Sequence, residues 1–229
     1  MNTTKLKLLI FFTILGLGYC HAQDWPNLER FREANAQLEE PDSSIYRVVF
    51  MGNSITEGWI KSRPEFFEGK NYVNRGISGQ TTPQMLLRFR QDVIDLKPSV
   101  VVILAGINDI AGNTGPSTLD MIMDNIVSMS ELAKSNHIKV VLCSVLPAKD
   151  FPWRRGIEPA EKVVKLNGLL RAYAEENHFV YVDYFSSMVD DSNGMKEGLA
   201  YDGVHPTALG YSIMEPLVEK AIAEAIEGN

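Results

Sequence analysis

The amino-acid sequence predicts one α/β domain in which helices cover both faces of a parallel, five-stranded sheet. Short runs rich in valine, isoleucine and leucine alternate with segments whose apolar residues recur at helical spacing. Three of the runs are almost continuously apolar, as is typical of parallel strands buried on both faces. The alternation of strand and helix favours crossover connections and therefore a three-layer α/β/α sandwich.

The individual elements are indicated by apolar runs and stripes. Five segments are expected to form the strands, namely Tyr46–Met51, Asn71–Asn74, Ser99–Ala105, Ile138–Val145 and Phe179–Asp183. A helix is expected from Pro26 to about Leu38. Two later helices are indicated by stripes of period 3.6, one formed by Leu119, Ile122, Met123, Ile126, Val127 and Ala133 and the other by Met214, Leu217, Val218, Ala221, Ile222 and Ala225.

Length and composition are those of a globular protein with one core. At 229 residues, the chain is long enough for one well-buried α/β domain and short for two. Its 45% hydrophobic and 22% charged residues exclude the disordered and fibrous classes.

The first residues are typical of a signal peptide. Two lysines precede the apolar stretch 8–18, which is too short to span a bilayer. Small residues then predict cleavage before Gln23, and thus export to the periplasm or the extracellular space. Lipid attachment at Cys20 is the alternative, which the bulky Tyr19 before it disfavours.

The chain is therefore divided into a signal peptide (1–22), an N-terminal helix and linker (23–44) and the α/β domain (45–229). Removal of the signal peptide takes away two lysines and no acidic residue, so the net charge changes from −7 to −9. A surface this acidic excludes nucleic acid as a partner, and no transmembrane segment is expected after cleavage. Cys143, the one remaining cysteine, lies in an apolar run and is expected to be a buried packing residue.

Ser54 is the first candidate for chemistry. The first strand breaks at Gly52 and presents Ser54 at the carboxyl end of the sheet, where open α/β folds bind their ligands. This place favours a nucleophile, which needs a neighbouring base to be activated. The alternative is a capping box, in which Ser54 and Glu57 satisfy free N–H groups at the start of a helix.

Of the four histidines, one is left for catalysis. His137 and His178 each stand between a helix and a strand, at the edge of the sheet opposite to Ser54, and their charge suits a helix C-terminus. The asparagine before each of them is expected to end its helix in the left-handed conformation. His21 lies in the predicted signal peptide, which leaves His205, after the last strand, as the candidate base.

Asp202 stands three residues before His205. Its carboxylate can reach the imidazole, hold its tautomer and stabilise the imidazolium formed during proton transfer. The alternative is that both residues only belong to a loop in which Thr207 caps the last helix. The sheet edge shared with Ser54 favours the catalytic interpretation.

Two further loops at this edge offer donors for an oxyanion hole. Asn108 follows the third strand, which neighbours the first in a doubly wound sheet, so its amide is expected beside Ser54. Gly79 follows the second strand and offers its backbone N–H. Both residues are also common turn formers. Four loops would then supply the parts that acyl transfer needs.

Other kinds of site were sought in the sequence. It has no phosphate-binding loop, dinucleotide fingerprint or metal-ligand spacing, so neither a cofactor nor a metal is predicted. Asp109 and Asp183 are expected to fix loops, with orientation of the base as the less favoured alternative. The loop 149–155, with Phe151, Trp153 and three basic residues, is predicted to be solvated or, less favoured, a lip that faces substrate.

Four motifs together resemble the GDSL (SGNH) hydrolase family over about residues 45–220. They are Gly52–Ile55, Asn74 to Gly79, Gly106 to Asp109, and Asp202 to Pro206. The resemblance implies a flavodoxin-like fold and makes 45–229 an SGNH hydrolase domain. It implies Ser54 as nucleophile, His205 as base and Asp202 as its orienter. It also implies that the Ser54 N–H, the Gly79 N–H and the Asn108 amide form the oxyanion hole.

Asn53 departs from the family pattern, which has an aspartate at this position. A carboxylate that commonly ties neighbouring loops together is therefore replaced by a neutral amide. The nucleophile, base and donors are kept, so activity is expected to survive with altered loop geometry or pH dependence.

The favoured function is that of an exported serine esterase that removes small O-acyl groups, such as acetyl, from a carbohydrate through an acyl-enzyme. The carbohydrate is expected because of export, the aromatic and basic loop, and the habits of similar exported proteins. One alternative is a lysophospholipase or thioesterase that acts on longer acyl chains. From another class, a carbohydrate-binding protein without catalysis is the third possibility. The expected partner is a small-molecule or glycan ester in each enzymatic case.

Overall fold

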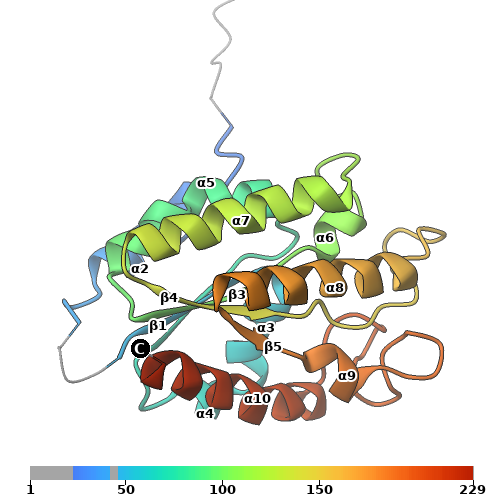
Figure 1. Ribbon diagram of the computed structural model, residues 1–229. Coiled ribbons are helices and arrows are strands. Elements are labelled where there is room, and N and C mark those ends of the chain that lie inside the picture. Colours follow the sequence, from blue (N-terminus) through green and yellow to red (C-terminus); the bar gives the residue numbers. More distant parts are fainter. Residues whose placement is uncertain (1–22, 42–45, 229) are drawn as a thin grey trace, which may run out of the picture.

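A five-stranded parallel sheet runs through the middle of the computed structural model, which describes residues 23–41 and 46–228 (Figure 1). The strands are β1 Val48–Gly52, β2 Tyr72–Gly76, β3 Val100–Leu104, β4 Lys139–Cys143 and β5 Val180–Val182, in the spatial order β2-β1-β3-β4-β5. All four pairings are parallel. The predicted α/β fold is confirmed, with each strand within two residues of its expected bounds. The predicted signal peptide, residues 1–22, lies outside the described residues.

Helices form a layer on each face of the sheet (Figure 1). One layer holds α5 Thr82–Asp92, α7 Leu119–Ser135 and α8 Ala160–Asn177, and the other holds α3 Ser54–Ser62, α9 Tyr184–Met188 and α10 Ala208–Glu227. The shorter turns are η1 Leu28–Phe31, α2 Arg32–Ala36, α4 Pro64–Phe67, η2 Ile94–Leu96 and α6 Ile107–Ile110. In the described part of the chain, no helix is both long enough and apolar enough to cross a bilayer.

Burial in the core explains why the strand sequences are continuous apolar runs. Every residue of β1 and β3 is buried, because helices cover both faces of the sheet. Both predicted stripes face the sheet, with Ile122 and Ile126 buried on α7, and Met214 and Val218 on α10. Cys143 is buried as expected, and burial raises the pKa of its thiol to about 12, which leaves it unreactive at neutral pH.

Helix α3, which begins at the candidate nucleophile, is anchored by an aromatic cluster. The Trp59 ring stacks on Phe66 and on Tyr211, at centroid distances of 5.1 and 5.3 Å. The Tyr211 hydroxyl also donates to the Ile55 carbonyl at 2.7 Å. Burial of these rings fixes the first turn of α3, and with it the position of Ser54.

The N-terminal segment differs from the single helix expected over Pro26 to Leu38. It forms η1 and the five-residue α2, and neither contains a buried residue. Asn27 takes the left-handed conformation with φ 59°, and the Asp24 carboxylate accepts from the Leu28 N–H at 2.8 Å, so a turn replaces the first part of the helix.

The two similar helix ends also differ from expectation in detail. The left-handed residues are His137 and His178, with φ of 60° and 58°, and not the asparagines before them. Asn136 and Asn177 instead donate their side-chain amides to carbonyls four residues back, at 2.7 and 3.0 Å. These bonds keep each asparagine in the last turn and shift the left-handed position to the next residue, where histidine is tolerated.

Candidate active site

Ser54, His205 and Asp202 lie in one hydrogen-bonded line. The Ser54 Oγ is 2.9 Å from the His205 Nε2, and the His205 Nδ1 is 2.7 Å from the Asp202 Oδ2. The other carboxylate oxygen of Asp202 accepts the backbone N–H groups of Val204 and His205, at 3.0 and 2.8 Å. The structure thus brings together three residues separated by up to 151 positions.

The Asp202 carboxylate is held in its ionised form. Burial opposes the charge, but the hydrogen bonds from the backbone and ring of His205 outweigh it and lower the pKa of Asp202 below its usual value. An ionised carboxylate only accepts hydrogen bonds, so the Nδ1 carries the proton. The Nε2 then presents its lone pair to the Ser54 hydroxyl, as a general base requires.

The N-cap of α3 is Asn53, and the capping-box interpretation of Ser54 is wrong. The Asn53 Oδ1 accepts from the Ile55 N–H at 3.0 Å, while the Glu57 side chain reaches Ser78 instead of the helix start. Asn53 is 1% exposed, so the residue that departs from the family pattern serves as a buried cap. The hydroxyl of Ser54 is left for His205. The backbone N–H of Ser54 has no acceptor among residues 23–41 and 46–228.

Asn108 and Gly79 lie at the same edge as Ser54 because β1 pairs with β2 on one side and β3 on the other. The Asn108 Nδ2 donates one hydrogen to the Gln80 carbonyl at 2.9 Å, which fixes the amide and leaves its second hydrogen. Gly79 has φ +78°, and within the described ranges nothing accepts its N–H. Ser54, Gly79 and Asn108 line one cavity.

Asp109 ties the Asn108 turn to helix α5. Its carboxylate accepts the Thr82 N–H at 3.0 Å and the Thr82 hydroxyl at 2.6 Å. Asp109 is 2% exposed, and this burial raises its pKa from 3.8 to about 6, although the bonds from Thr82 act in the opposite direction. The predicted loop-fixing role of Asp109 agrees with these contacts.

The raised pKa of Asp109 makes stability depend on pH. Protonated Asp109 favours the folded state, so this contribution is complete below pH 3.8 and is lost as the pH rises through about 6. At about 1.4 kcal/mol per pKa unit, the loss is about 3 kcal/mol. Asp109→Asn removes the titration. We therefore expect wild-type stability relative to this variant to fall by that amount between about pH 3 and 7.5, measured by urea unfolding. A pH-independent difference would contradict the prediction.

Asp183 is placed away from the base, so the alternative that it orients His205 is wrong. Its Oδ1 caps α9 by accepting the Ser186 N–H at 2.9 Å, and its other oxygen pairs with Arg171. Asp183 therefore fixes a loop, as expected.

The cavity above Ser54 has a volume of about 490 Å³ and a mixed lining. It is lined by Ser54, Glu57, Gly58, Lys61, Ser78, Gly79, Asn108, Asn113, Trp153, Tyr201 and His205. Two exposed rings flank the imidazole of His205: Tyr201 stacks on it at 5.6 Å and 12°, and Trp153 lies at 5.7 Å and 45°. Trp153 makes the loop after β4 a lip of the site, which was the less favoured expectation.

Arg154, beside Trp153, does not line this cavity. It is structural, since it donates to the carbonyls of Ala111 and Gly112 at 2.5 and 2.8 Å. Tyr201 and Glu57 were missed as site residues. Tyr201 could have been found because it stands next to Asp202, and Glu57 because it stands one helical turn after Ser54.

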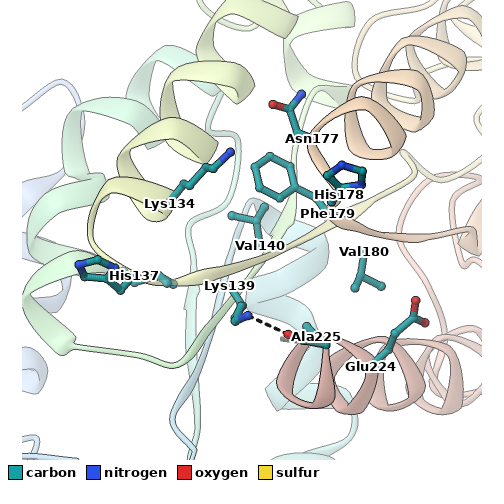
Figure 2. A pocket seen from close by; sticks show the side chains of 12 residues that line it. Lys134, His137, Lys139, Val140, Asn177, His178, Phe179, Val180, Glu224 and Ala225 are labelled. Atoms are coloured by element: carbon teal, nitrogen blue, oxygen red, sulfur yellow. Dashed lines mark hydrogen bonds between the residues drawn. The ribbon is translucent and has the colours of Figure 1, made fainter.

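A second cavity, of about 590 Å³, lies at the opposite edge of the sheet (Figure 2). Lys134, Lys139, His137 and His178 line it where α7 and α8 end. Basic side chains offset the partial negative charge of helix C-termini, and the Lys139 Nζ also donates to the Gly228 carbonyl at 2.8 Å. Neither histidine lines the cavity above Ser54, which agrees with a structural role for both.

A metal site was not predicted from sequence. Among the residues that the structure describes, no group of three His, Cys, Asp or Glu side chains could hold a metal ion.

Comparison with known proteins places the chain in a family. Residues 50–213 match the GDSL-like lipase/acylhydrolase family. A GDSL-like lipase from Bacteroides thetaiotaomicron has a similar structure, with a TM-score of 0.85 and 51% identity over 87% of this chain and 98% of that one. The esterase TesA of Pseudomonas aeruginosa is 30% identical over 161 residues, which are 68% of this chain and 73% of TesA.

Two further relatives are more distant. The acetylxylan esterase of Geobacillus stearothermophilus is 28% identical over 160 residues, which are 64% of this chain and 69% of that protein. A lipoprotein of Bacillus subtilis is 25% identical over 147 residues, which are 62% of this chain but only 58% of the lipoprotein. The match over residues 50–213 covers most of the chain and confirms the resemblance seen in the four motifs: the chain belongs to the GDSL-like lipase/acylhydrolase family.

Proposed function

We propose that the protein is a serine esterase with Ser54 as nucleophile, His205 as general base and Asp202 as the residue that orients the base. The observation that carries the proposal is the line of hydrogen bonds from the Ser54 Oγ through the imidazole to Asp202, at 2.9 and 2.7 Å. In such a line the base takes the hydroxyl proton, and the carboxylate stabilises the imidazolium that results.

The reaction proceeds through an acyl-enzyme. The Ser54 Oγ bonds to the ester carbonyl carbon as its proton passes to the His205 Nε2. The N–H groups of Ser54 and Gly79 and the Asn108 amide donate hydrogen bonds to the developing oxyanion. Collapse breaks the bond to the alcohol oxygen, which leaves with the proton from His205. Water then attacks the acyl-enzyme by the same route and releases the acid.

The substrate class that fits the cavity best is a small acyl ester of a carbohydrate. Trp153 and Tyr201 are 44% and 72% exposed, and flat exposed rings of this kind pack against the apolar faces of sugars. Lys61 and Asn113 offer polar groups to sugar hydroxyls. The acetylxylan esterase among the relatives supports this class. Export through a signal peptide at 1–22, ahead of the linker 23–44 and the hydrolase domain 45–229, is part of the proposal.

The two alternatives have less support. Long acyl chains need an extended apolar channel, and the aromatic rings of Trp153 and Tyr201 are the large apolar surfaces in the lining of the cavity. The family to which the chain belongs includes lipases and acylhydrolases, which keeps this alternative open to test. A binding protein without catalysis is disfavoured, because the hydrogen-bonded Ser54, His205 and Asp202 would serve no purpose in it.

The test is hydrolysis of p-nitrophenyl esters from acetate to palmitate, together with acetylated xylo-oligosaccharides. We expect acetate to be preferred. We also expect Tyr201→Ala and Trp153→Ala to raise KM for the oligosaccharide by roughly tenfold, as the loss of one ring contact would, and to leave KM for p-nitrophenyl acetate unchanged. A preference beyond about eight carbons would favour the long-chain alternative. No turnover of any ester would refute the esterase.

A further inference from the structure

We propose that Glu57 is a positioning residue, which holds the Gly79 N–H in place for the oxyanion. This inference rests on the proposed esterase mechanism. The Glu57 carboxylate accepts the backbone N–H of Ser78 at 2.8 Å and also the Ser78 hydroxyl. Ser78 directly precedes Gly79, and both residues line the cavity above Ser54.

The contact joins the nucleophile and a donor through one rigid element. Glu57 stands one turn after Ser54 on α3, and the aromatic cluster around Trp59 anchors that helix in the core. A shift of the Ser78 backbone relative to α3 would therefore change the distance between the Ser54 Oγ and the Gly79 N–H. Donors in an oxyanion hole act through fixed geometry.

The two oxygens of the Glu57 carboxylate have different partners. The Oε2 binds Ser78, whereas the Oε1 pairs with Lys61 at 3.2 Å and with Arg30 at 3.4 Å. Burial works against the charge, but the bonds from Ser78 and Lys61 prevail and lower the pKa of Glu57. The side chain is 16% exposed. A charged acceptor in such a place forms a stronger bond to an N–H than a neutral one does.

The turn that carries Gly79 needs this support. Gly79 is exposed and has φ +78°, and a Cβ at this position would meet nothing within 4 Å, so no side chain packs against this side of the residue. The turn is also held by bonds from the Ile77 N–H to the Gly52 carbonyl at 3.1 Å, from the Gln80 N–H to the Ile77 carbonyl at 3.3 Å, from Asn113 to the Gly79 carbonyl at 3.1 Å and from Asn108 to the Gln80 carbonyl at 2.9 Å. At 2.8 Å, the bond from the Ser78 N–H to Glu57 is shorter than each of these, and it lies directly before the donor.

The test uses steady-state kinetics and a boronic acid, which forms a tetrahedral adduct with an active serine. We expect Glu57→Ala to lower kcat by roughly 10- to 100-fold, a fraction of the loss of a whole donor, and to leave KM for p-nitrophenyl acetate unchanged. Affinity for the boronic acid should fall by the same factor as kcat. Glu57→Gln keeps one acceptor oxygen and should lie between wild type and alanine. Arg30→Ala removes a partner of the Oε1 but leaves both bonds to Ser78, so it should match wild type.

The outcomes separate this inference from the function on which it rests. Wild-type protein that neither hydrolyses esters nor binds the boronic acid would refute the esterase itself. An active wild type with unchanged kcat and boronic acid affinity in Glu57→Ala would overturn the positioning role. So would a raised KM with kcat preserved, which indicates contact with substrate. If thermal melts show that Glu57→Ala is unfolded, Glu57→Gln decides by the same two measurements.

Discussion

Ser54→Ala is expected to abolish ester hydrolysis while the protein stays folded. Removal of a nucleophilic serine lowers kcat by roughly 10⁵- to 10⁶-fold, because His205 then has no hydroxyl to activate. The helix start does not depend on the Ser54 side chain, since Asn53 caps α3. The free energy of unfolding should therefore change by less than about 0.5 kcal/mol. Hydrolysis of p-nitrophenyl acetate and a thermal melt on the same sample measure both effects.

The matched control is Ser62→Ala, at the other end of the same helix. It should keep full activity and full labelling by a fluorophosphonate, whereas Ser54→Ala should lose both. Retained turnover in Ser54→Ala, or a fluorophosphonate adduct on another serine in the wild type, would remove Ser54 from the mechanism.

Asn108→Ala should act on the transition state and hardly at all on substrate binding. The amide hydrogen that Gln80 does not use meets its best acceptor only when the carbonyl oxygen has become charged. Loss of one such donor lowers kcat by roughly 10²- to 10³-fold and leaves KM nearly unchanged. Steady-state kinetics on p-nitrophenyl acetate measures the two constants separately.

Asn108 also bonds to the Gln80 carbonyl, so a structural role must be separated from a catalytic one. Asn108→Asp keeps the shape but loses both amide donors, including the bond to the Gln80 carbonyl, and places a negative charge beside the oxyanion. It should lower kcat at least as far as alanine does. Asn136→Ala, at the opposite edge of the sheet, serves as the control. A raised KM and a lowered melting temperature with kcat preserved would leave the oxyanion to the N–H groups of Ser54 and Gly79.

The parts of the site that depend on topology could be predicted from the sequence. Buried parallel strands are apolar throughout, so β1 and β3 were recognisable, and their pairing placed Ser54 and Asn108 at one edge. His205 and Asp202 could be paired because His205 stands three positions after Asp202, a spacing that their side chains can bridge.

The parts of the site in which several side chains could form the same contact could not be predicted from the sequence. Asn53 and Ser54 are both good caps, and only the position of His205 decides that the serine hydroxyl turns away from the helix. Glu57 on α3 contacts Ser78 in the loop after β2. The two residues are 21 positions apart, so the spacing in the sequence does not predict this contact. Trp153 could be seen as an aromatic residue in a loop, but its approach to His205 depends on how Arg154 anchors that loop.

The N-terminal segment is attached in a way that determines which of its positions can vary in evolution. Side-chain amides of Gln80, Gln84 and Gln91 donate to the carbonyls of Pro26, Trp25 and Leu28, at 2.7, 2.8 and 2.5 Å. Every amino acid supplies a backbone carbonyl, so these contacts ask nothing of the side chains at 25, 26 and 28. The sequence requirement of these three contacts lies in the glutamines, so substitutions should accumulate faster at positions 25, 26 and 28 than at Gln80, Gln84 and Gln91.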